Sequence, residues 1–290
     1  MDGGERTRET TLEVDDAGVA TFTLNRPTKM NALSQSMFDN DLPAMIQRVE
    51  RDDAIRALVI AGAGGHFCSG ADVSRMQRSD GAPEPGRESN LRRVLDVIYR
   101  IVNLPKPVIA AVDGVAFGGG FSLAMTADIM LASPRARFCL VFGRIGLIPD
   151  MGVAYTLPRA IGARRAKELA MTGRSFGVDE AEAMGLINAV HPPETLLAEA
   201  QAMARNLAKG SATAQALAKS LMDRSLASSQ TEMTDAECAR ARAYGMMSVG
   251  QDIDVLVLGQ VGVGGDVSAA ALLAAIHGGA GADWVDAGHE

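Results

Sequence analysis

One acidic residue, Asp150, lies within a stretch of apolar and small residues that reads IGLIPDMGV. It is the only aspartate or glutamate between Asp128 and Glu168. A carboxylate that apolar neighbours shield from water has a raised pKa, and such a group can accept and return a proton near neutral pH. Because aspartate after proline is also common in turns, the position alone leaves both a proton-transfer role and an ordinary turn open.

Two glycine-rich segments, HFCSGADV and VAFGGGFSLAM, each follow a predicted strand, and the second runs directly into a helical pattern. Backbone N–H groups at the start of a helix have no acceptor within that helix. If the two segments met, their N–H groups could stabilise one developing oxyanion. Taken singly, each segment is explained at least as well by a tight turn that needs glycine.

Nucleotide-binding glycine motifs are disfavoured. The segment GAGGHF carries phenylalanine where the dinucleotide motif requires glycine, and no suitable βαβ unit with a ribose-binding acid follows it. The chain also contains no GxxxxGK[ST] sequence, which excludes a P-loop.

Hydrophobic periodicity indicates the elements that must position these segments. TTLEV and VATFTLN alternate with period two around the turn DDAG and predict a hairpin. The runs IRALVIAG, KPVIAAVDG and IMLAS predict short buried strands, whereas LRRVLDVIYRIVNL has helical spacing. A helix is also predicted over residues 34–51, with an irregularity at Pro43. Since the pattern turns mainly helical from Arg164 onward, we expect an α/β core with a helical C-terminal part.

The composition excludes several classes of protein. The chain has 290 residues and a net charge of -7, with no basic run that would favour nucleic acid. No apolar stretch approaches the roughly 18 residues that a membrane helix needs, so we expect a cytoplasmic protein that does not bind a membrane. The three cysteines are far apart and support neither a disulfide framework nor a zinc site, so no metal is expected.

Four segments in the order LNRPTKMNAL, HFCSGADV, KPVIAAVDGVAFGGG and FGRIGLIPDMG resemble the crotonase family, the enoyl-CoA hydratases and isomerases. The similarity covers about residues 11–242. It implies an α/β fold in which ββα units form a spiral, followed by a helical trimerisation region. The implied domains are a spiral core with an acyl-CoA site over residues 1–195, the trimerisation region over 196–242, and an atypical tail over 243–290. The implied assembly is a homotrimer or a dimer of trimers.

The resemblance also implies a set of site residues. The backbone N–H groups of Ala71 and Gly119 would bind the thioester oxygen, so we expect the two nitrogens to lie within about 7 Å of each other. The substrate would be a coenzyme A thioester, with no further cofactor. The residues implied to contact coenzyme A are Arg26, Lys29, Met30, Ala32, Ser69, Ala71, Asp72, Val73 and Gly119, and those implied to line the substrate pocket are Ser122 and Phe142.

The expected reaction depends on which acids are present. Hydratases of the family carry two glutamates, and this chain has Ser122 and Phe142 at those positions. Isomerase branches of the family, including the ring-epoxide isomerase of the phenylacetate route, carry an aspartate in a motif like GLIPDxG, which matches Asp150. Moving a double bond requires one base, whereas hydration requires a group for the water and another for the α-carbon proton. The resemblance therefore favours an isomerase, with Ile148, Pro149, Met151 and Phe142 expected to desolvate Asp150.

Two alternatives to the isomerase stay open. One is an enoyl-CoA hydratase, and the other is a pseudoenzyme that binds acyl-CoA without turning it over. Exchange of the α-proton of a bound acyl-CoA in D₂O would separate an enzyme from a pseudoenzyme. Supplying 2-enoyl and 3-enoyl thioesters in turn would separate a hydratase from an isomerase.

The last 48 residues, 243–290, contain no lysine or arginine and hold ten of the 31 glycines. In the family this part usually carries Lys or Arg with Phe and completes the coenzyme A site. The departure indicates either a reading-frame change after about Ser248 or a natural replacement of the segment. Either would weaken the binding of coenzyme A.

Overall fold

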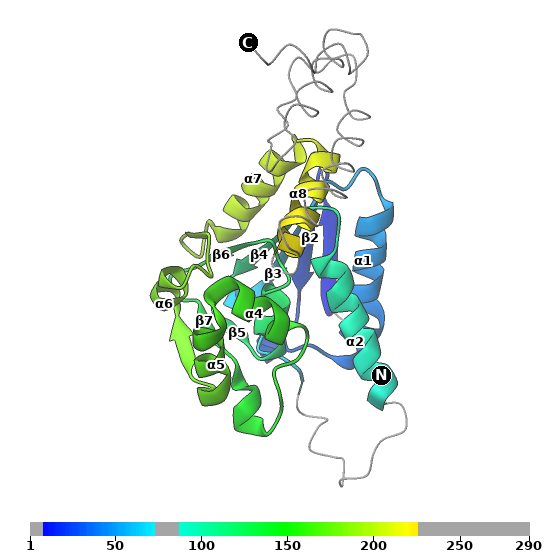
Figure 1. Ribbon diagram of the computed structural model, residues 1–290. Coiled ribbons are helices and arrows are strands. Elements are labelled where there is room, and N and C mark those ends of the chain that lie inside the picture. The colour runs from blue at the N-terminus through cyan, green and yellow to red at the C-terminus, as the bar shows by residue number, and fades with distance from the viewer. Residues whose placement is uncertain (1–7, 73–86, 226–290) are drawn as a thin grey trace, which may run out of the picture. The chain divides into compact units, whose positions relative to one another are not determined.

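The computed structural model describes residues 8–72 and 87–225 (Figure 1). The chain divides into two compact units, Met1–Gly210 and Ser211–Glu290. Of the second unit, the description covers the helix α8 (Ala212–Ser225). The strands and helices of the first unit position the candidate site, and the following paragraphs concern this unit.

The first unit contains short strands and helices in alternation. Its strands are β1 (Thr10–Val14), β2 (Val19–Leu24), β3 (Ala57–Gly62), β4 (Val108–Val112), β5 (Val115–Phe117), β6 (Ile129–Ala132), β7 (Arg137–Cys139), β8 (Ser175–Gly177) and β9 (Ala189–Val190). Its α-helices are α1 (Leu42–Arg51), α2 (Arg87–Val102), α3 (Gly119–Ala124), α4 (Val153–Ile161), α5 (Ala163–Thr172), α6 (Val178–Ala183) and α7 (Leu196–Ala208). Short 3-10 segments are η1 (Pro27–Lys29), η3 (Ala63–Gly65) and η5 (Val141–Ile145), and η2 (Met37–Asp41) is a π-helical segment.

The predicted hairpin is confirmed, because β1 and β2 pair in antiparallel register. The side chain of Asp15 closes its turn by accepting hydrogen bonds from the N–H groups of Ala17 at 3.0 Å and Val19 at 2.9 Å. Such a local side-chain bond to the backbone is the reason that aspartate is favoured at turns.

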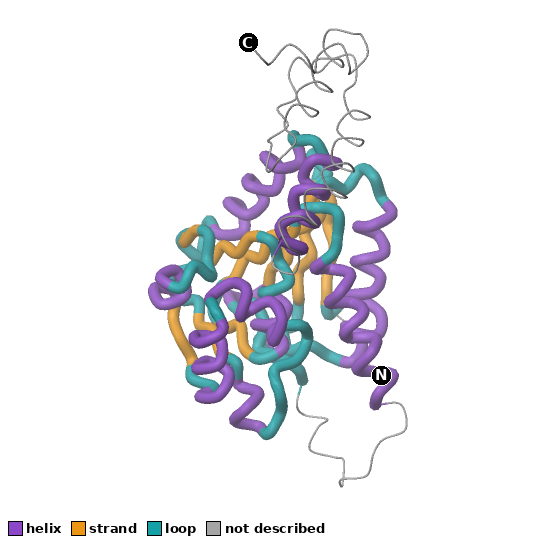
Figure 2. The backbone as a smooth tube through the Cα atoms, viewed as in Figure 1, coloured by secondary structure: helices purple, strands orange, loops and turns teal. Residues whose placement is uncertain are grey.

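The larger sheet has six strands in the order β1-β2-β3-β4-β6-β9, and all pairs after the hairpin are parallel. Figure 2 shows these strands enclosed by helices. Alternate residues of β3 enter two different cores: Leu58 and Ile60 pack with α1 and α2, and Ala57 and Val59 pack with α7. A parallel strand that is buried on both faces reads as a continuous apolar run, and this accounts for the sequence ALVIAG.

A smaller sheet has the order β5-β7-β8. Going along the chain, β4 belongs to the larger sheet and β5 to the smaller, and then β6 belongs to the larger and β7 to the smaller. Each of these two passes therefore adds one strand to each sheet before a helical segment follows. The result is the spiral of ββα units that the family resemblance implies.

The helix predicted over residues 34–51 is irregular, as expected. It begins with the π-helical η2 and continues as α1, whose first turn contains Pro43. Proline lacks an N–H group and is tolerated at the start of a helix, so the regular helix begins there. The buried apolar face of this segment includes Met37, Ile46 and Val49, each with 0% exposure.

The helix α7 begins at Leu196, the first residue of the trimerisation region that the family resemblance implies. Its residues Leu196, Ala200 and Ala204 are buried against the larger sheet, on the side opposite α1 and α2 (Figure 1). This helix therefore belongs to the first compact unit, which runs to Gly210. Residues 226–242 of the predicted trimerisation region and the whole tail lie outside the described residues. Within the described ranges, no helix is both long and apolar enough to span a membrane.

Candidate active site

The two glycine-rich segments meet because of one strand pairing. Cys68 and Ala116 form a parallel bridge, so residues at the same distance beyond each of them lie side by side. Three residues further along the two segments are Ala71 and Gly119. The pairing therefore brings together the two residues predicted to supply oxyanion N–H groups.

Glycine is required at two positions of the turn that residues 118–120 form ahead of α3. Gly118 has φ 50° and ψ -122°, a conformation open to glycine and strained for other residues. At Gly120 a Cβ would lie 2.2 Å from the carbonyl oxygen of Cys68, so only glycine permits the close approach of the two segments. The Gly118 N–H donates to the Cys139 carbonyl at 2.9 Å, which ties the turn to β7.

The two expected donors lie close to each other. A Cβ built on Gly119 would lie 3.8 Å from the Ala71 nitrogen. Because a Cβ and its own backbone nitrogen are about 2.5 Å apart, the nitrogens of Ala71 and Gly119 are separated by no more than about 6.3 Å. Two hydrogen bonds of about 2.9 Å to one oxygen span up to about 5.8 Å. The separation is thus below the expected limit of about 7 Å.

Neither N–H group has an acceptor among the described residues. In the bridge between Leu33 and Ala71, the Leu33 N–H donates to the Gly70 carbonyl at 2.8 Å and the Asp72 N–H donates to the Leu33 carbonyl at 3.0 Å. The N–H of Ala71 is therefore directed to the other side. The N–H of Gly119 is at the first position of α3, where no intrahelical acceptor exists. Two backbone donors without acceptors can stabilise negative charge that develops on a substrate oxygen.

Asp150 lies ahead of α4 and is bonded to α3, the helix that begins at the glycine turn. Its carbonyl oxygen accepts hydrogen bonds from the Ser122 hydroxyl at 3.0 Å and from the Val153 N–H at 3.2 Å. Its carboxylate oxygen Oδ1 is buried and has no hydrogen-bond partner. Burial raises the pKa of the Asp150 carboxyl, and a hydrogen bond from its own backbone N–H opposes the rise only in part. A carboxylate with this environment is suited to accept a proton.

Met151 joins the Asp150 segment to the turn over residues 118–120, which is called the oxyanion turn after its expected role. Its sulfur would lie 2.9 Å from a Cβ on Gly119, so the thioether fills the space next to that residue. Met151 has a left-handed φ of 52° and is buried, as is Phe142. Their burial is consistent with the prediction that they desolvate Asp150, and their contact with its carboxylate stays a prediction.

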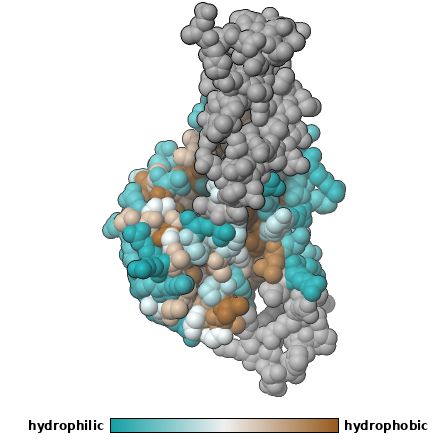
Figure 3. All heavy atoms as spheres, viewed as in Figure 1, coloured by the Kyte–Doolittle hydropathy of each residue, from teal (hydrophilic) through white to brown (hydrophobic). Residues whose placement is uncertain are grey.

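The prediction for Ile148 is wrong, because this side chain is 81% exposed and cannot desolvate Asp150. Ile145 and Leu147 are also exposed, so the loop before Asp150 presents apolar side chains to solvent. Apolar groups reach the surface elsewhere in the molecule too (Figure 3). The apolar composition of this stretch did not reveal which residues face inward, because the stretch is a loop without regular periodicity.

Arg26 is engaged within the protein. Its guanidinium donates to the Asp72 carboxylate at 2.9 Å and to the Ala32 carbonyl at 2.6 Å, and it forms an ion pair with Glu9 at 3.1 Å. These contacts hold the segment after β2 against the loop that carries Ala71. Contact of Arg26 and Asp72 with coenzyme A stays a prediction, and their observed contacts serve to position the Ala71 loop.

The other residues implied to contact coenzyme A lie on the same two segments. The Ser69 N–H donates to the Met30 carbonyl at 2.9 Å, and the Ser69 hydroxyl donates to the Lys29 carbonyl at 3.2 Å. Lys29 and Met30 are exposed and Ala32 is buried. Val73 lies outside the described residues.

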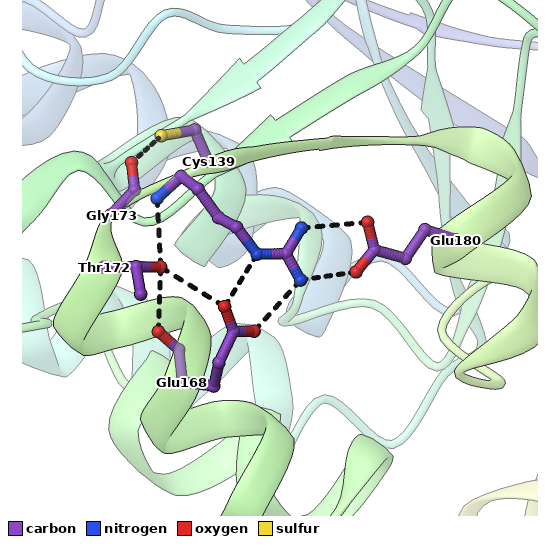
Figure 4. A network of polar contacts seen from close by, with 6 residues as sticks. Cys139, Glu168, Thr172, Gly173 and Glu180 are labelled. Atoms are coloured by element: carbon purple, nitrogen blue, oxygen red, sulfur yellow. Dashed lines mark hydrogen bonds and ion pairs between the residues drawn. The ribbon is translucent and has the colours of Figure 1, made fainter.

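A polar network behind β7 supports this region (Figure 4). Arg174 donates to Glu168 and to Glu180, and the Cys139 thiol donates to the Gly173 carbonyl at 3.1 Å. The network joins the end of α5 to the start of α6 and to β7, whose Cys139 carbonyl holds the Gly118 turn. The ion pairs join residues six positions apart, whereas the contact of Cys139 with Gly173 spans 34 positions and has no signal in the sequence.

Sequence reasoning also missed the contact of the Ser122 hydroxyl. Ser122 was predicted to line the substrate pocket, and in the structure it is 1% exposed with its hydroxyl directed at backbone carbonyls. No pattern in the sequence could show that a serine of α3 meets the backbone of Asp150. Among the described residues there is no cluster of side chains that could hold a metal ion.

Comparison with known proteins identifies the family of this chain. The model of the enoyl-CoA hydratase/isomerase family matches residues 15–248. The 1,2-epoxyphenylacetyl-CoA isomerase of Escherichia coli (strain K12) is 37% identical over 230 residues, which cover 79% of this chain and 86% of the relative. The chain therefore belongs to the enoyl-CoA hydratase/isomerase family.

Solved structures of the family have the same fold. An enoyl-CoA hydratase/isomerase from Cupriavidus metallidurans CH34 has a TM-score of 0.77 at 38% identity, covering 84% of this chain and 90% of that one. An enoyl-CoA hydratase from Mycobacterium smegmatis has a TM-score of 0.75 at 33% identity, covering 83% and 92%. The α/β spiral predicted from the four motifs is thus confirmed.

The C-terminal part matches a second family model, described as phosphoribosyltransferase, over residues 225–290. This match overlaps the first over residues 225–248 and includes the whole segment in which lysine and arginine are missing. How this segment arose, by a reading-frame change or by a natural replacement, stays a prediction that intact mass and resequencing of the gene would test.

Proposed function

We propose that this enzyme moves a carbon–carbon double bond of an acyl-CoA, from the 3-enoyl to the 2-enoyl position or within a related ring acyl-CoA. The observation that carries the proposal is the buried, partnerless Oδ1 of Asp150 on a segment that contacts the oxyanion turn. The similarity to the Escherichia coli isomerase supports it.

The proposed mechanism uses one base and two N–H donors. The thioester oxygen accepts hydrogen bonds from Ala71 and Gly119, which stabilise the enolate that forms as a proton leaves. Asp150 takes the proton from the α-carbon of the 3-enoyl thioester, the double bond shifts through the dienolate, and the same carboxyl returns the proton to the γ-carbon. Substrate and product have the same composition, so no further reactant is needed.

Hydration is the weaker alternative. It requires one group that activates water and another that handles the α-carbon proton. The two positions that carry glutamate in hydratases of the family are here Ser122 and Phe142, and both side chains are buried. Asp150 would have to perform both tasks.

The proposal is tested with pairs of thioesters in D₂O. We expect the wild type to convert a 3-enoyl-CoA to the 2-enoyl isomer and to exchange the α-proton of a bound acyl-CoA, while it hydrates crotonyl-CoA slowly. Rapid hydration of 2-enoyl-CoA without turnover of 3-enoyl-CoA would show a hydratase. Binding without exchange or turnover would show a pseudoenzyme.

We also propose that the enzyme works as a homotrimer or a dimer of trimers, as the family resemblance implies. Sedimentation of the full chain would measure the assembly. Because the tail departs from the family at the segment that usually completes the coenzyme A site, we expect weaker binding of coenzyme A thioesters than in relatives with that segment. Isothermal titration with a saturated acyl-CoA would measure it.

A further inference from the structure

We propose that Ser122 is a positioning residue, which holds the backbone of Asp150 against α3 and so keeps the base at a set distance from the oxyanion turn. The inference rests on the proposed function of Asp150. It assigns to Ser122 a task that differs from lining the substrate pocket.

The first observation is the contact itself. The Ser122 hydroxyl lies 3.0 Å from the Asp150 carbonyl oxygen and 3.3 Å from the Gly118 carbonyl oxygen. A hydroxyl has one proton to donate, and the shorter distance favours Asp150 as its acceptor. Within the described part of the chain, no other side chain donates a hydrogen bond to Asp150.

The second observation is where the two ends of this bond lie. Ser122 is on α3, three residues after Gly119, whose N–H is an expected oxyanion donor. The acceptor belongs to the residue that carries the candidate base. One hydrogen bond therefore links the helix that begins at the oxyanion turn with the segment that carries the carboxylate.

The third observation is that the backbone of Asp150 has few other hydrogen bonds, although the neighbouring Met151 is packed in the core. The next residue, Met151, has a left-handed φ of 52°, which costs free energy in a residue other than glycine. Besides the Ser122 hydroxyl, the Asp150 carbonyl has only the Val153 N–H as a donor among the described residues, at 3.2 Å. Without the hydroxyl, the turn can relax and the carboxylate can move away from its buried position.

A purely structural role is the alternative explanation. Serine within a helix often donates to the carbonyl four residues earlier, and Gly118 is that residue for Ser122. In that case Ser122 would satisfy its own hydroxyl in a buried place, and its loss would affect stability alone. Turnover at saturating substrate separates the two explanations.

The test compares Ser122→Ala with Thr126→Val as a matched control. Thr126 follows α3, is 4% exposed and donates to the Leu123 carbonyl at 2.7 Å, so the control also removes one buried hydroxyl near this helix. We expect Ser122→Ala to lower kcat for the 3-enoyl thioester by about 10-fold to 100-fold, the range for a base displaced by up to about 1 Å. The control should change kcat by less than about 3-fold, while both variants lose similar thermal stability.

Binding is measured with a saturated acyl-CoA, which cannot react. We expect its Kd to change by less than about 3-fold in Ser122→Ala, because the contact acts on the base and not on the thioester. If Ser122→Ala fails to fold, Ser122→Cys replaces it, since the thiol leaves no cavity, is larger than the hydroxyl and is only a weak donor. Its kcat should then fall in the same way.

The inference is overturned if kcat of the Ser122 variant matches that of Thr126→Val, or if the loss lies in Kd alone. Failure of the proposed function gives a different result, because Asp150→Asn would then retain wild-type turnover. If Asp150→Asn is inactive and Ser122→Ala is as active as the control, the proton-transfer role of Asp150 stands and the positioning role of Ser122 does not.

Discussion

Two aspartates of the same fold, Asp113 and Asp150, have opposite environments. Asp113 follows β4, and its carboxylate accepts hydrogen bonds from the Ser133 hydroxyl at 2.7 Å and from Arg135 Nε at 2.6 Å. Burial alone would raise the pKa of Asp113, but the bonds from Arg135 and Ser133 and the charge of Arg135 lower it overall. Burial acts on Asp150 in the same direction, no charged partner lies beside it among the described residues, and its pKa is raised.

The carboxylate of Asp113 stabilises the folded state, whereas that of Asp150 destabilises it. A partly buried carboxylate that is bonded to an arginine favours the folded state. A desolvated carboxylate with an unpaired oxygen opposes it, by an amount that a mutation to a neutral residue can recover. An unfavourable environment of this kind is found where a group has a chemical task, and this is the reason that Asp150 and not Asp113 is the candidate base.

The largest expected effect is on turnover. Asp150→Asn keeps the size of the side chain and removes the base, so kcat for a 3-enoyl-CoA should fall by about 10² to 10⁴. The binding of a saturated acyl-CoA should change little. Asp113→Asn is the control, and it should change kcat by less than about 3-fold, which corresponds to under about 1 kcal/mol. Equal turnover in the two variants would contradict the comparison.

The next effect is on stability and has opposite signs at the two positions. Asp113→Asn should lower the free energy of unfolding at neutral pH by about 1–2 kcal/mol, because it weakens charged hydrogen bonds whose arginine is largely exposed to solvent. Asp150→Asn should raise the free energy of unfolding by up to about 1 kcal/mol, since it removes a desolvated charge. Denaturant titrations of both variants measure the difference. A loss of stability in Asp150→Asn would mean that its carboxylate has a favourable partner.

The smallest effect is the pH dependence of these stability differences. The pKa of Asp150 is raised in the folded state above 3.8, so the folded protein loses relative stability as the pH rises from 3.8 through the raised value. The gain in the free energy of unfolding in Asp150→Asn should therefore be absent in acid and should grow as the pH rises through this interval. The pKa of Asp113 is lowered below 3.8, so its contribution is complete above 3.8 and is lost as the pH falls through the lowered value.

Denaturant titrations of the wild type and both variants between about pH 4 and pH 8 would measure these trends. The loss in the free energy of unfolding in Asp113→Asn should stay constant over this range. An advantage of Asp150→Asn that does not vary with pH would show that its cause is packing and not charge.

Much of the fold could be read from local patterns. The alternation in VATFTL and the uninterrupted apolar run in ALVIAG predicted β2 and β3, because a strand places successive side chains on opposite faces. The glycines at 118–120 marked a turn with special backbone geometry, and the structure has such a turn there. The isolated charge of Asp150 stood out because its surroundings in the sequence are apolar.

The remaining features depend on contacts between distant parts of the chain. The pairing of Cys68 with Ala116 decides that Ala71 lies beside Gly119, and the fold decides that the Ser122 hydroxyl meets the carbonyl of Asp150. It also decides that Ile148 points to solvent while Met151 points inward. Periodicity and turn chemistry act over a few neighbouring residues and are therefore visible in the sequence. Register and hydrogen bonds between segments result from the packing of the whole chain, so only the tertiary structure contains them.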